Sequence, residues 1–150
     1  MSGTLVIVRG YSDAEQQLLK EASEYAGHTD ASFHVLRLIS PQEHQSVESV
    51  EITSDIDRTD YEEPAKNQFE AEIADFIEEA VGDSFPYESH VKIADADSRT
   101  DTILDTADDL GCNHIFLVGK QRSPTGKAIF GDLTQKVILN FDGTITLTME

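Results

Sequence analysis

The chain has 150 residues, and its 29 acidic against 11 basic side chains give a formal net charge of −18 at pH 7. This length suits a single domain spanning residues 1–150, and such an acidic surface repels nucleic acid and anionic membranes. The single cysteine excludes an intrachain disulfide and favours a cytoplasmic protein. No run of about 18 apolar residues is present, so we predict no membrane span. No leader precedes the first strand, so we predict no signal peptide.

Strand and helix patterns alternate along the first part of the chain. The apolar run 5–8 predicts a strand buried on both faces. Ser12 and Glu15 form a capping box, and apolar residues at helical spacing continue to Gly27, where we expect the helix to end. Residues 33–39 are again mostly apolar and predict a second strand.

Residues 40–67 are the least regular part of the sequence. They are mainly polar, include Pro41 and Pro64, and carry scattered apolar residues that leave room for only one short strand or one turn of helix. A loop of this length in a compact domain is usually a lid, a partner-binding segment or a disordered segment. We therefore predict a long polar loop excursion over 40–67.

The second half of the chain repeats the alternation. Apolar residues at helical spacing over 69–80 predict a helix, and residues 87–93 alternate between apolar and polar as a half-exposed strand does. Ser98 can cap a further helix, which we expect Gly111 to end in the left-handed conformation. The remaining predicted elements are a strand at 114–118, a helix after Gly131 and a strand at 144–148.

These elements predict an α/β fold, with an open five-stranded parallel sheet and helices on both faces. The first, second and fourth strands are apolar throughout, so they belong in the middle of the sheet. The third and fifth strands alternate and belong at its edges. The strand order 3-2-1-4-5 satisfies both conditions. A ligand then binds at the carboxyl ends of the strands where the order reverses, between the first and fourth strands.

The segment after the fourth strand carries the strongest functional signal. Lys120, Arg122 and Lys127 lie close together, and residues 119–140 hold four basic residues against one acidic residue, a net charge of +3. Glycines in this segment let backbone N–H groups approach a ligand, and the start of the next helix favours an anion. The pattern predicts phosphate or anion binding. The alternative is an ordinary surface loop whose cations offset acidic neighbours.

Gly119 and Gly131 match the first and last glycines of the signature Gly-x2-Gly-x9-Gly-Ser/Thr, and Leu133 and Thr134 follow as its small or apolar pair does. In these residues and in the order of its elements, the whole chain resembles the universal stress protein family. The resemblance implies a Rossmann-like fold, a role in stress response, and binding of ATP or a related nucleotide, with or without Mg²⁺. The residues expected at this nucleotide- or anion-binding site are Arg9, Gly10, Leu38, Val118, Gly119, Lys120, Arg122, Gly126, Lys127, Gly131, Asp132, Leu133 and Thr134.

Several positions depart from the ATP-binding pattern of that family. The second glycine is Arg122, the interval between the outer glycines is one residue short, and the hydroxyl position is Asp132, whose carboxylate repels a triphosphate. The acidic residue expected at the end of the first strand aligns with Gly10, beside Arg9. The basic side chains offer a different hold on an anion. Two hypotheses follow: a protein that binds a nucleotide or another anion, and a non-enzymatic interaction module that has lost nucleotide binding.

Other catalytic patterns are weak. Asp55, Asp57 and Thr59 match the Asp-x-Asp-x-Thr motif of haloacid dehalogenase-type phosphatases, which gives a third hypothesis, a small phosphohydrolase. That chemistry needs the first Asp at the end of a buried strand, whereas these residues lie in the polar stretch, so we interpret the match as chance. We predict no catalytic residues, and the family resemblance implies at most slow nucleotide hydrolysis.

The five histidines show no metal-ligand spacing along the chain, so no metal site is predicted. His34 and His114 lie in apolar strands, and we expect them to be hydrogen-bonded structural residues.

The acidity itself suggests an environment. Acidic residues are spread through every predicted helix, and only six lysines are present. This composition is typical of a protein that works in concentrated salt, where repulsion between carboxylates is screened. We therefore interpret the chain as adapted to a saline cytoplasm.

The last strand predicts an assembly. Residues 144–148 contain no proline or charge that would discourage pairing at a sheet edge. The family resemblance implies dimerisation through this strand. We expect a homodimer with the two fifth strands antiparallel across a twofold axis.

Overall fold

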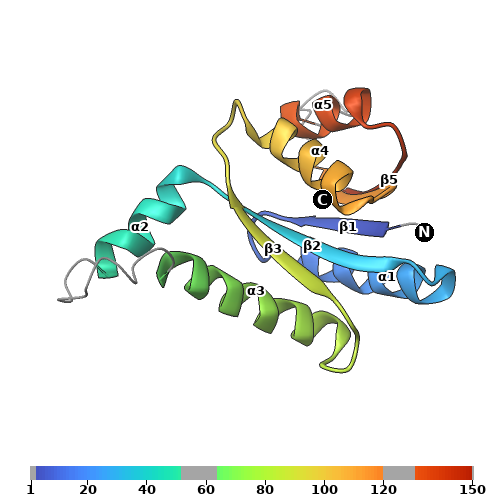
Figure 1. The fold of residues 1–150 in the computed structure, drawn as a ribbon, viewed down its shortest axis with the longest axis horizontal. Helices are drawn as coiled ribbons and strands as arrows, with labels where there is room; N and C mark the ends of the chain where they lie inside the picture. The colour runs from blue at the N-terminus through green and yellow to red at the C-terminus, as the bar shows by residue number, and fades with distance from the viewer. Residues whose placement is uncertain (1–2, 52–63, 120–130, 150) are drawn as a thin grey trace.

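The computed structural model describes residues 3–51, 64–119 and 131–149, with side chains described at 3–46, 67–119 and 131–149. Strands and helices alternate along the chain (Figure 1). In chain order the elements are β1 (Gly3–Val8), α1 (Asp13–Thr29), β2 (Ser32–Ile39), α2 (Pro41–Glu51), α3 (Pro64–Val81), β3 (Glu88–Ile93), α4 (Arg99–Leu110), β4 (His114–Gly119), α5 (Asp132–Asn140) and β5 (Thr144–Met149).

The five strands form one parallel sheet with the order β3-β2-β1-β4-β5, which confirms the predicted fold class and strand order. All residues of β1 and β4, and all but the first of β2, are buried, whereas β3 and β5 are only partly covered. The physical reason is the one that the sequence indicated, because central strands need apolar side chains on both faces and edge strands do not.

Each face of the sheet carries its own apolar core. Val6 and Val8 of β1 pack with α1 and α3 on one face, and Leu5 and Ile7 pack with α4 and α5 on the other. Figure 1 shows the two helix layers on either side of the sheet. Neighbouring side chains on a strand point to opposite faces. Alternate residues of each strand therefore contact different pairs of helices.

The helix ends follow the predictions in part. Ser12 and Glu15 form the expected capping box of α1, and Gly111 ends α4 in the left-handed conformation. Helix α1 continues past Gly27 to Thr29 and ends at Asp30, which adopts φ 57°.

Ser98 occupies the N-cap position of α4 as predicted, but its side chain makes no capping hydrogen bond to the helix. Its hydroxyl accepts a hydrogen bond from the Asp95 backbone N–H, and the Asp95 carboxylate accepts from the N–H groups of Asp97 and Ser98. The side chains of Asp95 and Ser98 are therefore used to close the turn before the helix.

The predicted loop over 40–67 was wrong where α2 forms and where α3 begins. Ser40 and Glu43 form a second capping box, in which the Glu43 N–H donates to the Ser40 hydroxyl at 3.2 Å and the Ser40 N–H donates to the Glu43 carboxylate at 3.2 Å. Pro41 occupies the first position of the helix, where its missing N–H costs nothing.

Residues 52–63, including the phosphatase-like motif, lie outside the described residues. None of the described helices has both the length and the apolar composition needed to cross a membrane.

Candidate functional site

The candidate site lies at the carboxyl edge of the sheet, where the strand order reverses between β1 and β4. From β1 the chain leads through Arg9 and Gly10 into α1, and β4 ends at Gly119 before α5 begins at Asp132. Of the predicted basic loop, Lys120, Arg122, Gly126 and Lys127 lie outside the described residues. The described part of the site therefore consists of the turn after β1, the end of β2 and the first turn of α5.

Glu15 occupies the turn that follows β1. Its carboxylate is buried and accepts hydrogen bonds from the backbone N–H groups of Arg9 at 2.6 Å, Gly10 at 3.1 Å and Ser12 at 3.1 Å. Such clustered amides at a helix start form an anion-binding concavity. Because an internal carboxylate already fills it, these amide groups are not available to a bound anion.

Arg37 lies at the end of β2 and was not among the predicted site residues. It is 2% exposed, and its guanidinium donates to the carbonyl oxygens of Arg9 at 3.1 Å and Leu38 at 2.7 Å, and to the Glu43 carboxylate at 2.6 Å. The Tyr11 ring lies under the same guanidinium, 4.7 Å from ring centre to carbon. Arg37 thus links the ends of β1 and β2 to the start of α2.

The charges of Arg37 and Glu43 stabilise each other. Burial opposes ionisation of Glu43, but hydrogen bonds from Arg37 and Ser40 outweigh it and hold the pKa of the carboxyl below its usual range. Burial likewise disfavours the Arg37 cation, yet Glu43 and Tyr11 raise its pKa overall. Tyr11 adopts φ 53°, and its hydroxyl donates to the carboxylate of Glu72 on α3 at 3.3 Å. The signal for Arg37 in the sequence was its position as the single charge within an apolar strand.

The first turn of α5 packs directly against the end of β4. A Cβ atom on Gly119 would lie 3.1 Å from the Met149 sulfur and 3.8 Å from Thr134 Cγ2, so the Met149 side chain would have to shift slightly to accommodate any other residue. Gly131 is the N-cap of α5 and adopts φ 79°, a conformation that favours glycine. It has no side chain with which to cap the helix, so the first-turn amides receive no acceptor from the N-cap residue.

The remaining predicted site residues divide by exposure. Arg9 is half-buried and Gly10 is exposed. Asp132 is also exposed and forms an ion pair with Lys136 at 3.1 Å. The buried residues, which contribute to the two cores or lie beside them, are Leu38, Val118, Leu133 and Thr134. These four position the backbone of the site, and the polar groups at its described surface come from the turn after β1 and the start of α5.

Comparison with known proteins agrees with this architecture. The sequence profile described as the universal stress protein family matches residues 1–147. The fold is similar to that of a universal stress protein from Archaeoglobus fulgidus, with 24% identity, 98% of each chain covered and a TM-score of 0.62. It is also similar to the Archaeoglobus fulgidus universal stress protein in complex with dAMP, with 16% identity, coverage of 98% and 97%, and a TM-score of 0.62.

A third similar structure is a universal stress protein in complex with cAMP, with 12% identity, coverage of 99% of this chain and 98% of that chain, and a TM-score of 0.53. None of the curated proteins matches the chain. These structural likenesses establish the fold, and the profile match extends over nearly the full length. The chain belongs to the universal stress protein family.

Proposed function

We propose that this protein is a cytoplasmic stress-response module that binds a nucleotide or another anion at the carboxyl edge between β1 and β4. The observation that carries the proposal is the start of α5. This helix begins at a glycine N-cap, Gly131, next to the end of β4 and at the reversal of strand order. The first-turn N–H groups and the positive end of the dipole at a helix start favour an anion. Two proteins of similar fold are described in complex with dAMP and with cAMP.

The charges of the segment favour some ligands over others. Lys120, Arg122 and Lys127 would contact phosphate oxygens, since charged donors form the stronger hydrogen bonds. Asp132 at the helix start opposes a highly charged ligand. We therefore expect a nucleotide monophosphate or a small anion to bind without metal, and ATP to bind better with Mg²⁺, which can bridge one protein carboxylate to phosphate oxygens.

The second candidate function is an interaction module that does not bind nucleotides. Glu15 favours it, because its carboxylate takes up the amide donors of Arg9, Gly10 and Ser12 that an anion would otherwise use. Under this alternative the partner surface is the outer edge of β5 (Thr144–Met149), which pairs with β4 on one side only. We propose a homodimer through this edge under either function.

Calorimetric titration in molar potassium chloride tests the binding proposal. ATP with and without Mg²⁺, ADP, AMP and sulfate are the ligands. Replacing Lys120, Arg122 and Lys127 together with glutamine should weaken binding by several kcal/mol in total, at about 1.5–3 kcal/mol per charged hydrogen bond. The matched control is Lys20→Gln, an exposed lysine on α1. Equal affinity of the triple variant and the control refutes the assigned site.

Asp132 provides a second arm of the same experiment. Asp132→Ser places a hydroxyl where the family pattern has one. It should tighten the binding of metal-free ATP more than the binding of AMP, because the triphosphate carries the larger charge. A wild type that binds none of the ligands supports the non-binding interaction module.

A further inference from the structure

We propose that His34, Glu88 and His90 form a binding site for a divalent transition-metal ion, with Zn²⁺ as the preferred occupant. The three residues lie on two neighbouring strands, β2 and β3, near their amino ends. The candidate nucleotide site lies at the carboxyl ends of β1 and β4. The two sites are therefore at opposite ends of the sheet, and this proposal does not rest on the proposed function.

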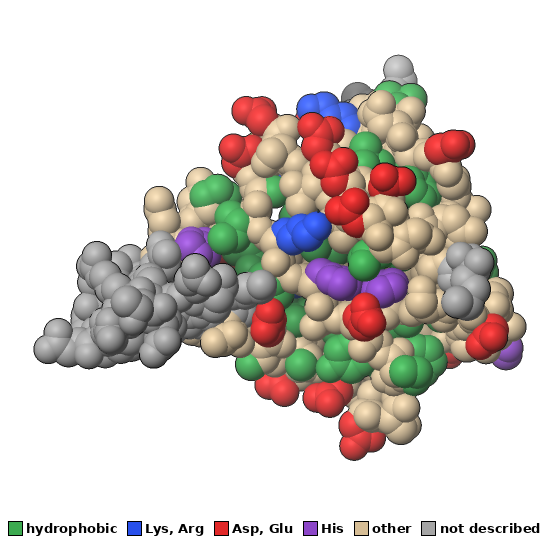
Figure 2. All heavy atoms as spheres, viewed as in Figure 1, with side chains coloured by type: hydrophobic (Ala, Val, Ile, Leu, Met, Phe, Trp, Pro, Cys, Tyr) green, Lys and Arg blue, Asp and Glu red, His purple; other side chains and the backbone are tan. Residues whose placement is uncertain are grey.

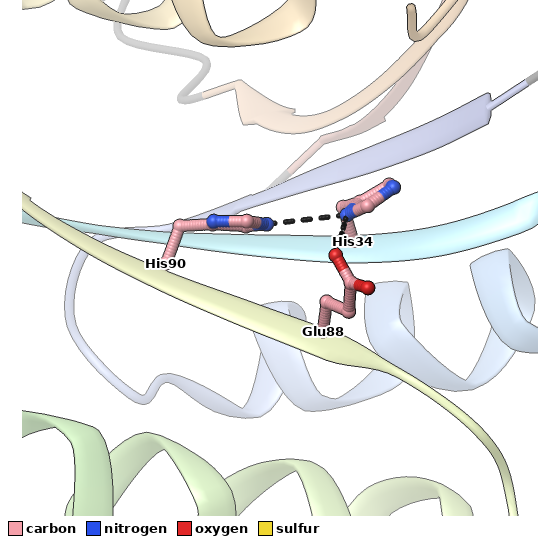
Figure 3. Close-up of side chains that lie close together, drawn as sticks. All are labelled: His34, Glu88 and His90. Carbon is pink, nitrogen blue, oxygen red and sulfur yellow. Dashed lines mark hydrogen bonds and ion pairs between the residues drawn. The ribbon is translucent and has the colours of Figure 1, made fainter. Parts of the chain in front are cut away.

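The strand register brings the three side chains together. In the parallel pair, His34 is aligned with Glu88 and Leu36 with His90. Glu88 and His90 are two residues apart and so point to the same face, the one that His34 shares with Leu36. That face is covered by α4 and α5 further along the sheet. Figure 3 shows the two imidazoles and the carboxylate converging in front of the strands.

The distances suit a tetrahedral metal ion. Nδ1 of His34 lies 3.1 Å from Nε2 of His90 and 3.4 Å from a carboxylate oxygen of Glu88, and all three ligand atoms lie within 4.8 Å of one another. Zinc–ligand bonds of about 2.0–2.1 Å at tetrahedral angles place neighbouring ligand atoms roughly 3.3 Å apart. The two measured separations are close to this value, so an ion needs only small side-chain movements to bind all three.

The donor set also specifies the class of metal. Two imidazole nitrogens and one carboxylate oxygen suit borderline ions such as Zn²⁺ and are poor ligands for Mg²⁺ or Ca²⁺, which prefer oxygen alone. Three protein ligands leave a fourth position for water or an external ligand. The ligand set can be approached from solvent, because Glu88 is exposed and His90 is half-buried. Figure 2 shows histidine side chains at the surface of this face beside acidic ones.

Lys92, two residues from His90 on the same strand, donates a hydrogen bond from its ammonium to the Thr106 hydroxyl at 2.7 Å. No other group of three potential ligands occurs among the side chains that the structure describes.

The test is a titration of chelator-treated protein with ZnCl₂, and separately with CoCl₂, in molar potassium nitrate, which screens unspecific attraction to the acidic surface. We expect one Zn²⁺ per chain, and a Co²⁺ visible spectrum of the intense type given by four or five ligands. His90→Gln should weaken Zn²⁺ binding by about 100-fold or more, and Glu88→Gln by at least about 10-fold, since loss of even an outer-shell partner costs 10- to 100-fold.

Both substitutions lie at accessible positions, so the fold should survive, and His34 is left intact because it is buried. The matched controls are His28→Gln and Glu79→Gln, which remove an exposed histidine and an exposed glutamate elsewhere. Thermal melts in chelator should coincide for all variants, and Zn²⁺ should raise the midpoint of the wild type and the controls only. If Zn²⁺ binds more weakly than about 100 µM, or if His90→Gln binds it like His28→Gln, the three residues form only a hydrogen-bonded group and the proposal is overturned.

Discussion

Glu43→Gln is the substitution that most directly tests how the edge of the candidate site is held. Glu43 neutralises the buried guanidinium of Arg37 and also caps α2 through Ser40. Glutamine keeps a neutral acceptor of nearly the same shape, so the change removes the charge and little else. The buried Arg37 cation then loses its counter-ion, although it keeps the carbonyl oxygens of Arg9 and Leu38.

The expected cost follows from these contacts. A hydrogen bond to a charged group contributes about 1.5–3 kcal/mol, and breaking a fully buried ion pair costs about 3–5 kcal/mol. The Glu43 side chain is 40% exposed, so water screens the pair and the lower range applies. We expect Glu43→Gln to reduce the free energy of unfolding by about 1–2 kcal/mol. Glu43→Ala, which also loses the cap, should cost about 2–3 kcal/mol.

Urea unfolding followed by circular dichroism measures these differences. Glu79→Gln is the control, because it removes one exposed negative charge from α3 and so accounts for the relief of general repulsion in a chain of net charge −18. It should change stability by no more than about 0.5 kcal/mol. If Glu43→Gln stays within that range of the control, the Arg37–Glu43 contact does not hold α2, and the reasoning is refuted.

The same contact predicts a pH dependence. The pKa of Glu43 is lowered in the folded protein, so the unfolded chain binds this proton more readily. The contribution of Glu43 is therefore complete above its unfolded pKa of about 4.3 and is lost as the pH falls through the lower folded value. The difference between the wild type and Glu43→Gln should be constant from about pH 7 to pH 5 and shrink in more acidic solution.

Three further predictions concern other parts of the molecule. Burial raises the pKa of the Cys112 thiol to about 11, so a disulfide reagent at pH 8 should modify it far more slowly in the native protein than in urea; equal rates would contradict the burial. The thermal midpoint should rise from low to molar potassium chloride, because salt screens carboxylate repulsion, and a flat midpoint would contradict salt adaptation. Light scattering at molar salt should show a dimer for the wild type and for Thr146→Val. Thr146→Pro should be a monomer, because only proline removes a backbone N–H from β5. A monomeric wild type or a folded, dimeric Thr146→Pro would exclude this interface.

The strand order could be predicted because burial acts on whole strands. Central strands are covered on both faces and must be apolar throughout, and edge strands such as β3 and β5 alternate. The predicted hydrogen-bonded role of His114 is also confirmed, since its Nε2 lies 2.7 Å from the Thr146 hydroxyl on the neighbouring strand. Both predictions rested on the apolar or alternating pattern within single strands, which can be read directly from the sequence.

Helix α2 was missed although its start carries the same Ser-x-x-Glu pattern that correctly predicted α1. The polar composition of 40–67 outweighed that pattern, because a helix with few apolar residues has little to bury. One contact that stabilises it comes from Arg37, a side chain on the preceding strand, and no periodicity within the helix reveals that contact. The role of Glu15 was hidden in the same way, since the capping box predicts its bond to Ser12 but not those to Arg9 and Gly10.

The histidine–glutamate group shows a different limit. The alternation of β3 places Glu88 and His90 together on its polar face, and the predicted strand order makes β2 its neighbour. The sequence of β2, however, is apolar on both faces, with Val35 in one core and Leu36 in the other. Its pattern therefore does not say whether His34 lies on the same face of the sheet as Glu88 and His90. A slip of one residue in the pairing would send His34 to the opposite face and separate it from both ligands. Only the register of β2 against β3 resolves this, and that register depends on packing along both strands at once.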